Sequence, residues 1–306
     1  MNNTKELENL LKDVQYRDQQ INLLFDLLIR KKRFLYPLFH LYGLSGTGKS
    51  FLIKKFMKKF CDGSTTLLSA DTTSKEKSSR KTVSGLVCKK YHIYLNCKEM
   101  CHNSTLSLFH EIVEQVKTIL VKQNSELIEM EEEPDLIISD IENVEKSNDC
   151  SNYIRQLKSL LSKLSNRNTK SYLYFVIDNA DSLKYFKDSA NLFLMLCKLN
   201  EYLNVETLET NSEDVVNICT LFITEQDWHS LISDCDLMSR TEATRPFVIL
   251  FNDYSKEEMK VILQTTAQQL VAIQYYSENK ITNHENNVQF FAKIILDVFH
   301  PICKVD

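Results

Sequence analysis

Glycine and proline are scarce in this chain, with 5 glycines and 4 prolines among 306 residues. This scarcity excludes collagen-like and low-complexity proteins, which are rich in one or both. No apolar run reaches the roughly 18 residues that a membrane-spanning helix needs, so we expect no membrane partner. A basic surplus is also missing, since 37 basic and 41 acidic residues give a net charge of −4. Stand-alone nucleic-acid binders usually have such a surplus, so any contact with DNA should be local or come through partner proteins.

A secretory leader is not apparent either, because the first residues, MNNTKELENLLKD, are polar and mixed in charge. With nine cysteines and no such leader, we expect a reducing compartment, cytosol or nucleus. The closest group is Cys97, Cys101 and His102, which has no second ligand pair at a spacing suited to zinc. We interpret these cysteines as small buried hydrophobic residues rather than as a metal site.

Five apolar runs, rich in β-branched and aromatic residues, predict buried strands. They lie at residues 34–43, 91–97, 171–181, 215–225 and 245–253. Segments with apolar residues at helical spacing separate most of them. Strands that alternate with helices favour an α/β fold, in which helices flank a parallel sheet.

Only helical patterns follow residue 255, so we place a domain boundary near Tyr254. Residues 1–254 should form a base domain, and residues 255–306 should form a small helical unit packed on it. Three polar or acidic segments interrupt the base domain, and we interpret them as insertions. They span about residues 62–90, 123–150 and 204–214.

Three of the five glycines stand in one short segment, YGLSGTGKSF. The segment fits the phosphate-binding pattern G-x-x-x-x-G-K-[ST] with Gly43, Leu44, Ser45, Gly46, Thr47, Gly48, Lys49 and Ser50. Several backbone N–H groups must face the phosphates at once, which requires a tight loop that glycine permits. We expect Lys49 to reach the β- and γ-phosphates of ATP, and Ser50 to bind Mg²⁺. An apolar run before the loop and a helical pattern after it provide the context that the pattern requires.

A phosphate loop also needs a carboxylate for its metal ion, at the end of a neighbouring strand. Asp178 in LYFVIDNAD meets this requirement, so we predict that Ser50 and Asp178 hold Mg²⁺. Ring-forming ATPases usually have Glu at the next position, where it orients or deprotonates the attacking water. Here the residue is Asn179, and an amide cannot take a proton. Asp181 stands two residues further on, where we expect it to be misplaced for this role. We therefore predict nucleotide binding with little hydrolysis.

Other residues have more than one interpretation. Thr224 ends a predicted strand and could touch the γ-phosphate, or could be satisfied by the backbone. Tyr16 and Arg17 could contact adenine, or could simply begin a helix. Arg240 could reach a neighbouring subunit's nucleotide as an arginine finger, with Arg245 a weaker candidate, or both could be ordinary surface arginines.

Several segments together resemble the initiator clade of the AAA+ ATPases, which includes the subunits of the origin recognition complex (ORC). They are YRDQQINLLFDLL, FHLYGLSGTGKSF, YHIYLNCKEM, LYFVIDNADSL, LFITEQDWHSL and RPFVILFNDYSKEEMKVIL. The resemblance implies an AAA+ base domain followed by a helical lid. It also implies a nuclear ATP-binding subunit that sits in a partial ring with other ORC subunits, binds origin DNA through that complex and helps load the replicative helicase.

Members of this clade continue from the lid into a winged-helix domain, whereas this sequence reaches Asp306 within the expected lid. We therefore expect a partial lid and no winged-helix domain in these residues. Two other functions stay open. The chain could be an active P-loop ATPase or kinase, or an autonomous DNA-binding protein. The amide at Asn179 and the negative net charge favour an ATP-binding assembly subunit over both.

Overall fold

The computed structural model describes nine segments of the chain. They are residues 2–30, 36–61, 66–67, 87–100, 104–128, 150–164, 169–204, 216–234 and 245–266. Every structural statement below concerns these residues.

A six-stranded sheet forms the centre of the fold, with strand order β2-β3-β4-β5-β1-β6. The strands are β1 (Leu38–Tyr42), β2 (Thr66–Leu67), β3 (Val87–Asn96), β4 (Thr169–Asp178), β5 (Asn217–Thr224) and β6 (Phe247–Leu250). Strands β3, β4, β5, β1 and β6 are parallel, and only β2 runs antiparallel to its neighbour β3. The parallel α/β fold predicted from the sequence is therefore confirmed.

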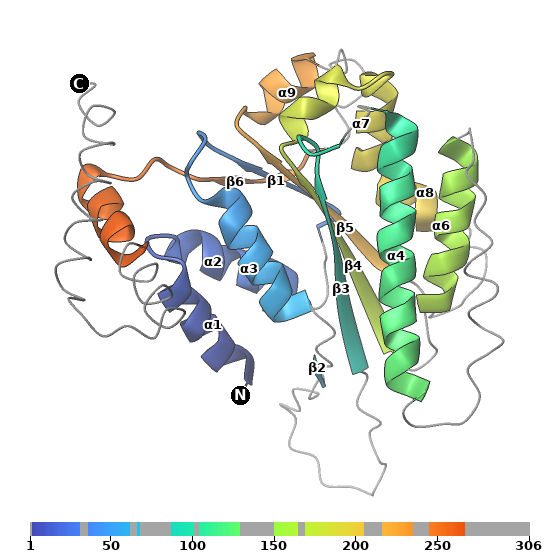
Figure 1. The fold of residues 1–306 in the computed structure, drawn as a ribbon, viewed down its shortest axis with the longest axis horizontal. Helices are drawn as coiled ribbons and strands as arrows, with labels where there is room; N and C mark the ends of the chain where they lie inside the picture. Colours follow the sequence, from blue (N-terminus) through green and yellow to red (C-terminus); the bar gives the residue numbers. More distant parts are fainter. Residues whose placement is uncertain are drawn as a thin grey trace, which may run out of the picture.

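Helices cover both faces of the sheet (Figure 1). One face carries α1 (Asn2–Asp13), α2 (Asp18–Leu24), the π-helical turn η1 (Phe25–Arg30) and α3 (Lys49–Cys61). The other carries α4 (Thr105–Ile128), α6 (Cys150–Leu164), the 3-10 helix η2 (Ala180–Tyr185), α7 (Ser189–Cys197), α8 (Leu199–Asn204) and α9 (Trp228–Asp234). Because the central strands are buried on both faces, their sequences are continuously apolar rather than alternating.

Two hydrophobic cores follow from this layering, one on each side of the sheet. In β1, Phe39 and Leu41 point into the core under α3, while Leu38 belongs to the core on the opposite face. His40 also points to that second face, where its ring lies 5.2 Å from the ring of Trp228 in α9. Strand β1 therefore joins the two cores, and its carboxyl end is held in place from both sides.

Strand β3 begins earlier than the sequence indicated. It starts at Val87 rather than at residue 91, and its ten residues pair in register with β4, from Val87 with Thr169 to Asn96 with Asp178. Lysines at 89 and 90 hid this extension, since β4 supplies the partner that makes polar residues continue as a strand. Within the predicted insertions, residues 66–67 form β2, residues 123–128 continue α4, and the other described residues lie at the ends of elements.

Residues 251–255 lead from β6 into a helix at residues 256–266, and the rest of the expected lid lies outside the described residues. This helix lies close to α1 and α2 (Figure 1), where Gln15 Nε2 donates a hydrogen bond of 3.3 Å to Thr265 Oγ1. No helix in the described segments is both long and apolar enough to cross a membrane.

Candidate functional site

A cleft of about 240 Å³ opens at the carboxyl ends of β1, β4 and β5. It is lined by residues 45–51 of the loop and α3, by Asp178, Asn179 and Asp181 after β4, and by residues 223–225 at the end of β5. In open parallel sheets, ligands bind at this edge, where the strand ends and the helix N-termini meet. The structure therefore brings the predicted phosphate loop and Asp178 to one site.

The glycines of the loop have clear steric reasons. Gly43 adopts φ +152°, and a Cβ there would lie 2.2 Å from the backbone oxygen of Phe251, which follows β6. Gly48 adopts φ +84°, and a Cβ there would lie 2.8 Å from the hydroxyl of Tyr254. The backbone conformation disfavours larger residues at both positions, and at Gly43 the backbone of Phe251 also leaves no room for a Cβ. The concentration of glycine in this segment thus follows from how tightly the loop is wrapped.

Lys49 begins α3 and is buried, with 7% of its surface exposed. Its ammonium donates hydrogen bonds to three oxygens of the loop. These are Gly43 O at 2.6 Å, Leu44 O at 2.7 Å and Thr47 Oγ1 at 3.2 Å. Burial lowers the pKa of Lys49 from its usual value, and the nearby carboxylates act in the opposite direction. The loop thus holds a cation at the N-terminus of a helix, an arrangement suited to anions.

Asp178 is buried and accepts three hydrogen bonds. Ser50 Oγ and the backbone N–H of Asn179 donate to Oδ1, at 2.8 and 2.9 Å, and the Tyr94 hydroxyl donates to Oδ2. Burial raises the pKa of Tyr94, and its hydrogen bond to Asp178 does so too, so this hydroxyl keeps its proton. Ser50 and Asp178 offer hydroxyl and carboxylate oxygens of the kind that Mg²⁺ binds beside phosphates.

Tyr94 and Asn96 were missed by sequence reasoning. The alternation of β3 puts residues 94 and 96 on one face, and the register sets Asn96 beside Asp178. Two polar residues alternating at a strand end are a weak signal, because they become informative only when the neighbouring strand is known. Tyr94 contacts Asp178, and Asn96 contacts Asn179.

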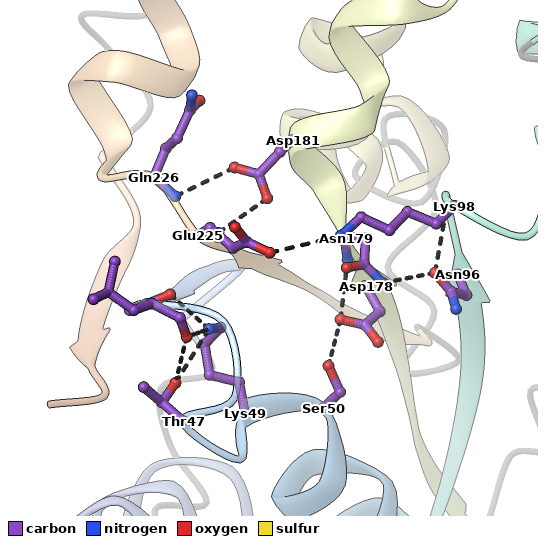
Figure 2. Close-up of polar contacts among 12 residues, drawn as sticks. Thr47, Lys49, Ser50, Asn96, Lys98, Asp178, Asn179, Asp181, Glu225 and Gln226 are labelled. Atoms are coloured by element: carbon purple, nitrogen blue, oxygen red, sulfur yellow. Dashed lines mark hydrogen bonds and ion pairs between the residues drawn. The ribbon is translucent and has the colours of Figure 1, made fainter. Parts of the chain in front are cut away.

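Asn179 has a left-handed backbone with φ 54°. Its side-chain Nδ2 donates a 2.7 Å hydrogen bond to Asn96 Oδ1 (Figure 2). Asp181 accepts hydrogen bonds from the backbone N–H groups of Glu225 and Gln226, at 2.9 and 3.2 Å. This carboxylate therefore joins the end of β4 to the end of β5.

Thr224 lines the cleft, but its hydroxyl already has two partners. It donates to the backbone oxygen of Gln226 at 2.7 Å, and His40 Nε2 lies 2.6 Å away. Since the single hydroxyl proton goes to Gln226, His40 must donate from Nε2. Burial lowers the pKa of His40 to about 4, which agrees with a neutral ring. A contact between Thr224 and the γ-phosphate stays a prediction.

Arg17 is buried and joins three parts of the chain. Its guanidinium donates to Thr47 O at 3.1 Å and to Asn252 O at 2.7 Å, and its carbon lies 3.8 Å from the centre of the Tyr254 ring. Tyr16 is 40% exposed. Arg17 thus supports the phosphate loop through its hydrogen bond to Thr47 O, and a contact of residues 16 and 17 with adenine stays a prediction.

The other predicted residues are two arginines and the group of Cys97, Cys101 and His102. Arg240, Cys101 and His102 fall outside the described residues, while Arg245 is exposed just before β6. Cys97 is buried, and burial raises the pKa of its thiol to about 12. No group of three or more His, Cys, Asp or Glu side chains suited to a metal occurs in the described part of the chain.

Comparisons with known proteins agree with this architecture. The model of the AAA ATPase domain family matches residues 13–208, which is more than half of the chain. Among solved structures, a chain of Drosophila ORC bound to DNA is similar, with a TM-score of 0.54, 17% identity, and coverage of 98% of this chain and 60% of that one. The Aeropyrum pernix ORC2 protein, solved in ADPNP–ADP complexes, gives a TM-score of 0.50, 17% identity, and coverage of 94% and 64%.

At these identities the likeness concerns the fold, and the chain spans less than two thirds of the length of either structure. A search of curated proteins found no match. The family match covers the phosphate loop, the end of β4 and strands β1 to β4, while β5 and β6 follow the matched residues. The chain therefore belongs to the AAA ATPase domain family, and its fold is similar to that of the Drosophila ORC chain.

Proposed function

We propose that this chain is an ATP-binding subunit of an origin recognition complex, of the subunit 5 type, in which ATP acts mainly as a structural ligand. One observation carries the nucleotide site. Ser50 and Asp178 are 128 residues apart in the sequence, yet Ser50 Oγ lies 2.8 Å from Asp178 Oδ1, at the cleft that also contains Lys49. A loop that can cradle phosphates, a cation and a paired hydroxyl and carboxylate are the parts that a Mg·ATP site requires.

Mg²⁺ would bind to Ser50 and Asp178 in this proposal. Both supply hard oxygen donors, and Mg²⁺ typically takes only one or two protein ligands, with phosphate and water oxygens as the others. The ion would neutralise charge on the phosphates. Tyr94 and the N–H of Asn179 then orient the Asp178 carboxylate, since each donates a hydrogen bond to one of its oxygens.

Little hydrolysis is expected because the position after Asp178 has no proton acceptor, and the other two carboxylates that line the cleft, Asp181 and Glu225, both have partners. Asn179 has an amide, which donates to Asn96. Asp181, the next carboxylate in the sequence, already accepts two backbone hydrogen bonds. Bound ATP can still stabilise the folded, assembly-competent chain, by about 2.7 kcal/mol at a hundred times its dissociation constant.

The assignment to an origin recognition complex rests on the resemblance of the sequence motifs and on the shared fold. PFVILFNDYS, around β6, is the segment that points most specifically to subunit 5. Nuclear location, origin DNA as a partner through the complex, and a role in helicase loading belong to this proposal. The arginine at position 240 would then contact a neighbour's nucleotide.

The test measures ATP binding and turnover separately. Isothermal titration of Mg·ATP into the wild-type chain should show binding, and Lys49→Ala should weaken it by more than about tenfold, because a buried charge-assisted contact is lost. Lys58→Ala, on the exposed face of the same helix, is the matched control and should bind as the wild type does. Turnover near the enzyme median of about 10 s⁻¹ would overturn the structural role of ATP.

The subunit assignment needs a second measurement. The chain is mixed with the remaining ORC subunits from the same source, with and without Mg·ATP, and assembly is followed by size-exclusion chromatography. We expect incorporation that depends on ATP and is lost in Lys49→Ala. Failure to join the complex under any of these conditions would refute the assignment, while leaving the nucleotide site itself intact.

A further inference from the structure

Lys98 lies beside the cleft and extends toward Glu225, one of the residues that line it. It stands in the turn after β3, and its Nζ lies 3.6 Å from Glu225 Oε1, after β5. In Figure 2 its side chain runs from the end of β3, past Asn179, toward Glu225. The end of β4, where Asn179 stands, is between these two strands in the sheet. Lys98 therefore crosses the strand end from which a catalytic base would normally act.

The backbone of this turn is fixed by hydrogen bonds. Asn96 Oδ1 accepts from the backbone N–H of Lys98 at 3.2 Å and from Asn179 Nδ2 at 2.7 Å. Asn96 Nδ2 donates to Glu99 Oε1 at 2.6 Å, and the N–H of Cys97 donates to Asp178 O at 2.9 Å. Since the main chain is held against β4, only the side-chain torsions of Lys98 remain free to redirect its ammonium.

The cleft has more negative than positive side chains. Among the described residues that line it, Lys49 is the one cation, whereas Asp178, Asp181 and Glu225 are carboxylates. Burial lowers the pKa of Lys49, and all three carboxylates oppose this shift, which places them within electrostatic range of the phosphate loop. A triphosphate brings one phosphate group more than a diphosphate into this negative surrounding. Beside Lys49 and the Mg²⁺ that Ser50 and Asp178 would hold, a further cation near the cleft would therefore favour the triphosphate.

Lys98 can change partners at little cost. The Lys98–Glu225 pair is exposed, with 57% and 46% of the two side chains accessible, and its 3.6 Å separation is long for a hydrogen bond. Exposed pairs of this kind contribute little to stability. Asn179 offers Lys98 no competing charge, because its side chain is a neutral amide. A terminal phosphate in the cleft would be a stronger partner than the solvated Glu225 carboxylate.

We propose that Lys98 recognises the terminal phosphate, and so makes the site prefer a nucleoside triphosphate over a diphosphate. The cation is supplied within the chain, from the turn that follows β3. This proposal rests on the nucleotide binding proposed above. It assigns to Lys98 a role in discrimination, while Lys49 and the loop provide binding that both nucleotides share.

The test compares ATP with ADP in the full chain. Isothermal titration in the presence of Mg²⁺ gives both dissociation constants for the wild type, Lys98→Gln and Lys98→Arg. In Lys98→Gln we expect ATP binding to weaken about tenfold and ADP binding to change less than about twofold, as loss of one charge-assisted hydrogen bond would produce. Lys98→Arg retains the charge and should recover most of the preference.

Lys117→Gln is the matched control, because Lys117 also pairs with a carboxylate, Glu114, but does so on α4. It should leave both constants unchanged. Thermal unfolding without nucleotide should be the same for Lys98→Gln and the wild type. If the wild type binds both nucleotides and Lys98→Gln keeps the same ATP-to-ADP ratio, only the role of Lys98 is refuted. If the wild type binds neither nucleotide, the proposed function and this inference both fail.

Discussion

His40 should make the stability of this protein depend on pH. It lies in β1 with none of its surface exposed, and burial lowers its pKa from 6.5 to about 4. Because the folded-state pKa is below the unfolded value, protons bind the unfolded chain more tightly. Its stabilising contribution is complete above about pH 6.5 and is lost as the pH falls toward about 4. Lowering the pH from about 7.5 to about 5 should therefore reduce the free energy of unfolding by about 2 kcal/mol through this group alone.

The substitution His40→Phe isolates this effect. It removes the titrating ring but keeps an aromatic side chain against Trp228, 5.2 Å away. Urea unfolding gives the free energy of unfolding of both proteins at each pH. We expect the stability of the variant relative to the wild type to be about 2 kcal/mol greater at the lower pH. His229→Gln, on the exposed side of α9, is the control and should follow the wild type. A difference between wild type and His40→Phe that did not change with pH would refute the reasoning.

Two further predictions concern the cleft and its support. Asn179→Glu places a proton acceptor beside Asp178, so steady-state phosphate release should rise about 100-fold or more. Unchanged release would mean that something other than the missing base limits hydrolysis. Arg17→Ala leaves Thr47 O and Asn252 O without their donor, so urea unfolding should show a loss of about 2–4 kcal/mol, and ATP binding should weaken with it. A loss confined to ATP affinity, with unfolding unchanged, would contradict the supporting role of Arg17.

The fold could be predicted because its signals are local. Each buried parallel strand is a continuous apolar run, and this signal needs no knowledge of its neighbours. The phosphate loop is equally local, since one tight turn requires glycine at Gly43 and Gly48 for reasons of backbone geometry. Asp178 was found because metal-binding carboxylates stand at strand ends. Its place beside Ser50 then follows from the parallel register of β1, β5 and β4.

What could not be predicted depends on contacts between distant segments. Arg17 precedes an ordinary amphipathic helix, and nothing around it indicates that it will meet Thr47, Asn252 and Tyr254. Tyr94 was invisible for a similar reason, because its role depends on which residue of β4 stands beside β3. The roles of such residues depend on tertiary contacts, which the neighbouring residues in the sequence do not indicate.

Asn179 combines both kinds of information. The sequence alone indicates a chemical loss, since an amide replaces the usual base. The structure adds a reason from the backbone, because φ 54° is a conformation that asparagine adopts far more readily than glutamate. The strain of placing a glutamate there is about 1 kcal/mol, which a stable domain can tolerate. Backbone geometry therefore favours asparagine without requiring it. An Asn179→Glu variant that folds and hydrolyses ATP would show that this site lacks only its base, and that the asparagine is what keeps bound ATP intact.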